Sequence, residues 1–132
     1  MLNSDVMSDR SIALAVDLRE DAEALPEQIV MAFQRVLGRM PSKDEHSQML
    51  AYVHKMVSHH QEHQPERVEY PTEVVRSLVE EFSGKPFDYV EILPVFRDYV
   101  PDVKPWMVDP RTRAVADMCL LLFNTNEFAY VY

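Results

Sequence analysis

Residues 32–45 read AFQRVLGRMPSKDE, and this stretch decides how the first half of the chain folds. Gly38-Arg39-Met40-Pro41 is typical of a helix end, with a glycine near the C-cap, a cation at the negative pole and then a proline. Ser42 and Glu45 follow with the spacing of a capping box, which begins a new helix. The stretch therefore predicts a helix end, a short turn and a helix start in immediate succession.

The helices on either side of this turn are expected over residues 26–38 and 42–63, and together they form a helical hairpin. Pro26 suits the first turn of a helix. Apolar residues at spacings of three and four predict one buried stripe on each helix, with Phe33, Leu37, Val53 and Val57 inside. Residues 4–24 are expected to form a further helix with a weaker apolar stripe.

A buried helix is expected near the end of the chain, over residues 110–124. Asp109 is a good N-cap and Pro110 a good first-turn residue. The sequence that follows is apolar on most sides, which indicates a central position with Met118 and Leu122 in the core.

An aromatic tail follows this helix. Phe128, Tyr130 and Tyr132 alternate with small residues, a period that suits an extended segment with the rings on one side. We expect the tail to dock on its own domain, because three rings offer enough apolar area to hold it. The alternative is a tail that mediates self-association or binds another protein.

The segment between the helical parts, residues 65–109, is acidic and rich in proline. Seven of the nine prolines lie between positions 65 and 110, a density that opposes long helices. Residues 73–93 carry β-branched and aromatic residues on both sides of Ser83-Gly84, which favours a β-hairpin. A short helix over residues 73–82, capped by Thr72, is the alternative. The aromatic residues here are expected to fill a core rather than to grip a partner; they are Phe82, Phe87, Tyr89, Phe96, Tyr99 and Trp106.

The composition indicates one mainly α domain, residues 1–132, with 47% hydrophobic content. Its parts are a helical segment (1–64), the proline-rich acidic segment (65–109), and a helix with the aromatic tail (110–132). Thirteen Lys and Arg against 22 Asp and Glu give a formal net charge of −9, which repels nucleic acid and anionic lipid. The N-terminus lacks the pattern of a signal peptide, and no apolar run is long enough to span a membrane.

Candidate reactive groups are few. His59 and His63 lie four residues apart on one helix face and are the candidate metal ligands; a solvated helix end is the plainer interpretation. Cys119 lies in an apolar run, which predicts a buried thiol without a catalytic role. No catalytic constellation, nucleotide loop or haem attachment motif is recognisable, so we expect no enzymatic activity and no cofactor.

Three pieces of the chain resemble one family. They are MLNSDVMSDRSIALA at residues 1–15, AFQRVLGRMPSKDE at 32–45, and RAVADMCLLLFNTNEFAYVY at 113–132. Together they resemble the C-terminal part of planctomycete-specific domain one, a domain of unknown function that closes large exported proteins, often beside a cytochrome c domain. Residues 74–93 also fit that region.

The resemblance implies that the chain is the C-terminal portion of a longer protein, located in the periplasm or outside the cell. Its partners would then be the upstream domains of the same polypeptide. The function expected is a non-catalytic structural or interaction module. The alternative is an accessory domain of a redox or polysaccharide-processing enzyme whose active site lies upstream, which rests on analogy alone.

Overall fold

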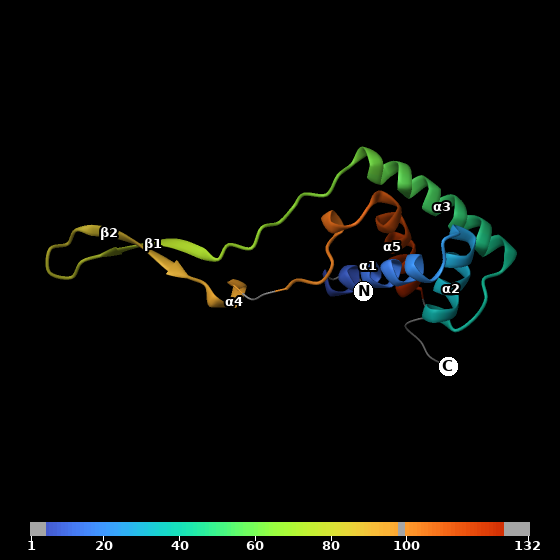
Figure 1. Cartoon of the computed structure of the whole chain (residues 1–132), viewed down its shortest axis with the longest axis horizontal. Helices are drawn as coiled ribbons and strands as arrows, with labels where there is room; N and C mark the ends of the chain where they lie inside the picture. Colours follow the sequence, from blue (N-terminus) through green and yellow to red (C-terminus); the bar gives the residue numbers. More distant parts are fainter. Residues whose placement is uncertain (1–4, 98–99, 126–132) are drawn as a thin grey trace. The chain divides into compact units, whose positions relative to one another are not determined.

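A computed structural model describes residues 5–97 and 100–125 of the chain (Figure 1). The chain divides into two compact units, one drawn from Met1–Glu66 and Asp102–Tyr132 and one formed by Arg67–Pro101. The first is helical and the second holds a two-stranded sheet. The predicted mainly α character is therefore confirmed. A single folding domain over residues 1–132 stays a prediction.

The helical unit contains four α-helices and a short 3-10 turn among its described residues. They are α1 (Asp5–Asp21), α2 (Leu25–Leu37), α3 (Lys43–Glu62), η1 (Pro105–Met107) and α5 (Pro110–Phe123). Helix α5 packs mainly against α1 and α3, while α2 makes smaller contacts with all three (Figure 1).

This packing differs in detail from the expected helical hairpin. Helices α2 and α3 do follow each other through a short turn, but the main partner of α3 is α5 rather than α2. The reason is that α5 offers apolar side chains on most of its surface, whereas α2 offers a single stripe.

The core of the helical unit is built around α5. Val115, Met118 and Cys119 have no exposed surface, and Leu122 is 2% exposed. Of the other residues expected inside, Phe33 and Val53 are buried, while Leu37 and Val57 are partly buried against the same cluster. Burial of large aliphatic and aromatic side chains contributes about 1.5–3 kcal/mol each, so this cluster is the main source of stability.

The turn that leads from α2 to α3 has the predicted chemistry. Gly38 ends α2 with a φ of 69°, a left-handed conformation that glycine adopts without strain. The Ser42 side chain accepts from the Glu45 N–H at 3.2 Å, and the Glu45 carboxylate accepts from the Ser42 N–H at 2.7 Å. Arg39 also pairs with Glu45. The predicted capping box is therefore confirmed.

The start of α5 is fixed by Asp109. Its carboxylate accepts from the Thr112 N–H at 2.7 Å and pairs with the Arg19 guanidinium on α1 at 2.6 Å. Burial by itself would raise the pKa of Asp109, but the hydrogen bonds from Arg19 and Thr112 outweigh it and lower the pKa to about 2. Asp109 thus caps α5 and ties it to α1.

We predict that Asp109→Ala lowers the free energy of unfolding by about 1 kcal/mol at neutral pH, because an N-cap is lost. Since the folded-state pKa is depressed below the ordinary value of 3.8, the carboxylate stabilises the fold above about pH 4. That contribution is lost as the pH falls toward 2. Urea unfolding at several pH values should show the difference between wild type and variant shrinking over this window.

Asp109→Asn is the matched control, because asparagine keeps the cap without the charge. It should retain much of the stability lost in Asp109→Ala, and the difference between the two variants should not change with pH, because neither titrates at position 109. An Asp109→Ala deficit that is the same at pH 2 as at pH 6 would contradict the assigned role of the charge.

The second unit is a β-hairpin followed by a short helix. Strands β1 (Glu73–Val79) and β2 (Pro86–Ile92) pair antiparallel, with Val75 opposite Val90, and α4 (Pro94–Arg97) follows. Residues 73–79 are thus a strand and not part of a short helix. The connection is a loop of residues 80–85 with Gly84 at a φ of 66°, longer than a two-residue Ser83-Gly84 turn. The aromatic tail, with Phe128, Tyr130 and Tyr132, lies outside the described residues.

Candidate functional site

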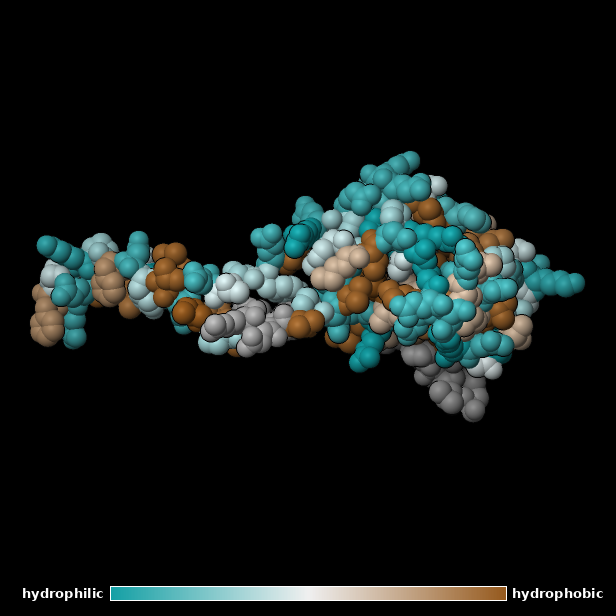
Figure 2. Space-filling model, viewed as in Figure 1, coloured by the Kyte–Doolittle hydropathy of each residue, from teal (hydrophilic) through white to brown (hydrophobic). Residues whose placement is uncertain are grey.

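The hairpin exposes apolar side chains on both faces of its two-stranded sheet. One face carries Val75, Val79, Val90 and Ile92, with exposed fractions between 56% and 67%. The other carries Leu78, Phe87 and Tyr89, with exposed fractions between 37% and 52%. Figure 2 shows apolar residues at the surface of this segment, interspersed with hydrophilic ones.

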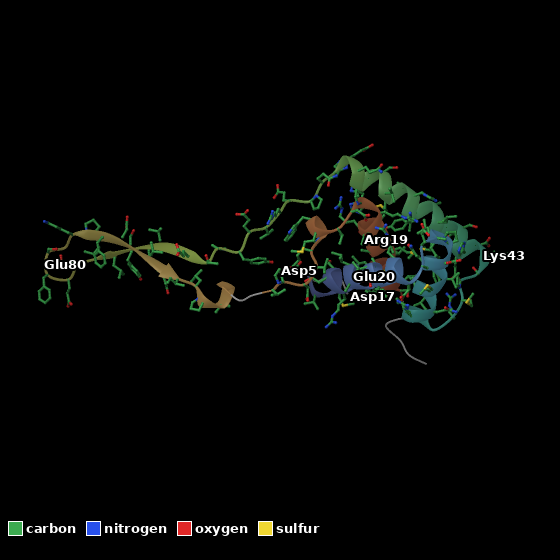
Figure 3. The ribbon with its side chains drawn as sticks, in the orientation of Figure 1. Asp5, Asp17, Arg19, Glu20, Lys43 and Glu80 are labelled. Carbon is green, nitrogen blue, oxygen red and sulfur yellow. The ribbon has the colours of Figure 1, made fainter. Side chains whose placement is uncertain are left out.

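The loop of the hairpin presents an aromatic ring beside carboxylates. Phe82 is 96% exposed, more than any other large apolar residue in the described part of the chain. Glu80, which is labelled in Figure 3, and Glu81 precede it directly. An exposed ring at the tip of a hairpin is a typical anchor for a pocket on another molecule.

These exposures correct the prediction that the middle aromatics fill a core. It is wrong for Phe82, Phe87 and Tyr89, because two strands alone cannot enclose side chains on either face. Trp106 lies within η1 and is half-buried. The side chain of Phe96 and the whole of Tyr99 lie outside what the structure describes.

Polar contacts across the strands hold the hairpin in register. Arg76 pairs with Glu91 on one face, and the Ser77 hydroxyl donates to Asp88 on the other. Residues 67–101 as a whole carry four Lys and Arg against seven Asp and Glu, a net charge of −3. The hairpin therefore exposes apolar side chains within a segment of net negative charge.

The candidate metal ligands His59 and His63 lie at the C-terminal end of α3. Both are exposed, and their rings stack with centroids 4.5 Å apart. The Nδ1 atom of His63 lies 3.1 Å from the carbonyl oxygen of His59. Across residues 5–97 and 100–125, no three His, Cys, Asp or Glu side chains gather closely enough to hold a metal ion.

The neighbouring histidine, His60, points into the helical unit. Its Nε2 atom lies 2.5 Å from the Asp117 carboxylate on α5, and both residues are only partly exposed. They line a cavity of about 160 Å³ together with Ser8 and Ile12 of α1 and Arg113 of α5. The pair joins α3 to α5 at one edge of the core.

Arg113 is the most connected charged side chain of this region and is only 5% exposed. Its guanidinium donates to the carbonyl oxygens of Pro105 (3.1 Å) and Val108 (2.6 Å). It also donates to the carbonyl oxygen of His60 (3.3 Å) and to the side chain of Gln64 (3.2 Å). Arg113 therefore clamps the end of α3 and the segment before α5 onto α5 itself.

Cys119 is fully buried in α5, as predicted. Burial raises the pKa of its thiol to about 12. A thiol with such a pKa is protonated at neutral pH and is a poor nucleophile.

The sequence interpretation missed His60, Asp117 and Arg113. One signal was present: His60 shares the helix face of Met49, Val53 and Met56, which places it on the buried side of α3. Asp117 and Arg113 are the charged residues in an otherwise apolar stretch of α5, and a charge in such a helix needs a partner.

Comparison of the chain with family models, with curated proteins and with solved structures finds no match. In the described ranges, none of the helices combines the length and the apolar character needed to cross a lipid bilayer.

Proposed function

We propose that this chain is a non-catalytic protein-interaction module whose binding element is the β1–β2 hairpin. The observation that carries this proposal is the exposure of apolar side chains on both faces, with Val75 at 67% and Phe87 at 48%. A two-stranded hairpin by itself is marginally stable in water, and exposed apolar patches mark interaction sites. A protein partner would bury the surface that the chain leaves open.

The sequence of the strands supports this proposal. Strands that face water on one side alternate apolar and polar residues, whereas strands covered on both sides carry apolar residues in near-continuous runs. In β1 and β2 apolar residues occur on both faces: Val74 and Leu78 share one face, and Val75 and Val79 the other. Neither strand is a continuous apolar run, since polar residues such as Arg76 and Asp88 interrupt them, but each face of the hairpin carries apolar residues that a partner can cover.

The state of the reactive side chains favours a non-catalytic role. Both terminal nitrogens of the Arg113 guanidinium donate to main-chain or side-chain acceptors, and His60 is paired with Asp117. The Cys119 thiol is buried. Arg113 and His60 thus use their hydrogen bonds to join α3 to α5, which is a structural role.

We further propose that the module closes a larger exported protein and works in the periplasm or outside the cell. The resemblance of residues 1–15, 32–45 and 113–132 to planctomycete-specific domain one supports this, and it makes the upstream domains of the same polypeptide the first partner to test. The reading frame upstream of Met1 should then continue without a stop codon. A stop codon immediately before Met1 would overturn this part of the proposal and leave the interaction module untouched.

Replacement of residues 67–101 by a flexible glycine–serine linker tests the hairpin as the binding element. We expect the intact chain to bind the segment encoded upstream of Met1 in calorimetry, and the linker variant to lose that binding. The urea-unfolding midpoint of the helical unit should stay unchanged, because the hairpin belongs to a separate compact unit.

A double variant, His59→Ala with His63→Ala, is the matched control, since it changes exposed side chains of α3 and leaves the hairpin intact. It should bind like the intact chain. Equal binding by the intact chain and the linker variant would show that the hairpin is not the binding element.

A further inference from the structure

We propose that the hairpin binds its partner by strand addition: the outer edge of β1 pairs with the edge strand of a sheet in another protein. The partner strand is apolar and carries a lysine or arginine opposite Glu73. This inference rests on the proposed function and names the surface and the kind of partner.

The hydrogen bonds at the two ends of the hairpin show which backbone groups point outward. The Glu80 N–H donates to the Lys85 carbonyl at 2.9 Å, and the Leu93 N–H donates to the Thr72 carbonyl at 2.8 Å. In an antiparallel pair, hydrogen-bonded and non-hydrogen-bonded residue pairs alternate. The even-numbered residues of β1 therefore bond to β2, and the odd-numbered ones direct their N–H and C=O groups away from it.

The outward groups of β1 form an open edge. They belong to Glu73, Val75, Ser77 and Val79, and each of these residues has an N–H to donate. Within the described residues the sheet consists of β1 and β2 alone, so this edge has no neighbouring strand. A row of unpaired N–H and C=O groups is a template for pairing with another strand.

The opposite edge, on β2, is less able to pair with another strand. The residues of β2 that face outward are Pro86, Asp88, Val90 and Ile92. Pro86 has no N–H, and a proline is one of the devices by which natural sheets prevent pairing at an edge. β1 has neither a proline nor a lysine. The asymmetry assigns the binding edge to β1.

Pairing of the β1 edge with β1 of a second copy of this chain is unfavourable. Two β1 strands that pair antiparallel over their full length, Glu73 opposite Val79 of the other copy, place Arg76 directly opposite Arg76. Like charges directly opposite each other on neighbouring strands are destabilising. Each copy also carries a net charge of −9, which opposes association.

The negative charge of the hairpin indicates that the partner strand is basic. Glu73 begins β1 on the outward-facing edge, and residues 67–101 carry a net charge of −3. Edge strands of natural sheets often carry lysine, which opposes pairing with another strand unless an acidic residue lies opposite it. An acidic hairpin with an open apolar edge complements such a strand, because a cation opposite Glu73 forms a favourable cross-strand pair.

Fluorescence anisotropy with a labelled short peptide of alternating valine and lysine tests the assignment on the full chain. The peptide is an extended, basic strand, and we expect saturable binding that weakens with salt. Val75→Pro and Val90→Pro form the decisive pair, because the two valines lie opposite each other and both face outward. Val75→Pro should weaken binding about tenfold, and Val90→Pro should leave it unchanged.

Glu73→Lys is a second variant that removes no backbone donor. It therefore tests the β1 edge even if Val75→Pro disrupts the strand. It should weaken binding of the valine–lysine peptide and strengthen binding of a valine–glutamate peptide. Equal losses in both proline variants, no saturable binding by the wild type, or a dimer of the chain that Val75→Pro abolishes would each overturn the edge assignment. If the edge assignment fails, the proposed function is still supported when the linker variant loses binding to the segment encoded upstream of Met1.

Discussion

Replacing Leu122 with alanine should lower the free energy of unfolding of the helical unit by about 2–5 kcal/mol. Leu122 is 2% exposed and lies in the core cluster that α5 forms with α1, α2 and α3. Truncation removes buried apolar atoms and leaves a cavity that close-packed neighbours fill only in part. Urea unfolding followed by circular dichroism at the helical band measures the loss.

Leu121→Ala is the control for this prediction. Leu121 precedes Leu122 on the same helix and is 42% exposed, so its truncation should lower the free energy of unfolding by less than about 1 kcal/mol. A Leu122→Ala loss below about 0.5 kcal/mol would mean that α5 is peripheral, against the packing described.

Replacing Arg113 with methionine should destabilise the helical unit by about 3 kcal/mol. Methionine fills much of the space of the arginine stem but donates no hydrogen bond. The carbonyl groups of Pro105, Val108 and His60 would then lose a charged donor in a largely buried place. Because these groups belong to α3 and to the segment before α5, the end of α3 and that segment should loosen together.

Arg111→Met provides the comparison, since Arg111 donates one long bond of 3.3 Å to the Glu23 carbonyl at the surface. Its effect should stay within about 0.5 kcal/mol. Arg113→Lys should recover part of the loss, because an ammonium keeps the charge but not the planar set of five donors. Equal effects of Arg113→Met and Arg111→Met would show that Arg113 is not a clamp.

Local chemistry explains why the helices could be predicted from the sequence. The capping box of Ser42 and Glu45, and the sequence Asp109-Pro110, act through residues close in the chain. The apolar surface of α5 also predicts its central place. The expected bounds of α2, α3 and α5 therefore agree with the structure to within a residue at each end.

The contacts that were missed join residues far apart in the sequence. His60 and Asp117 are separated by 57 positions, and no local pattern pairs them. The burial expected for the aromatic residues of the hairpin was wrong for another reason: β-branched and aromatic residues predict strands, but they do not reveal whether the chain holds enough strands to bury them. Phe82 shows this, since its type suggests a core and its surroundings provide none.

Backbone amide hydrogen exchange of the isolated chain tests the central claim most directly, namely that the hairpin is an element the chain itself leaves uncovered. The amides of Val115, Cys119 and Leu122 in α5 should exchange through global unfolding of the helical unit. The inward amides of Arg76 and Leu78 should exchange on the order of a thousandfold faster, because a bare two-stranded sheet opens readily. Equal protection of the β1 and α5 amides from exchange would contradict this claim, because it would show that the hairpin is already covered.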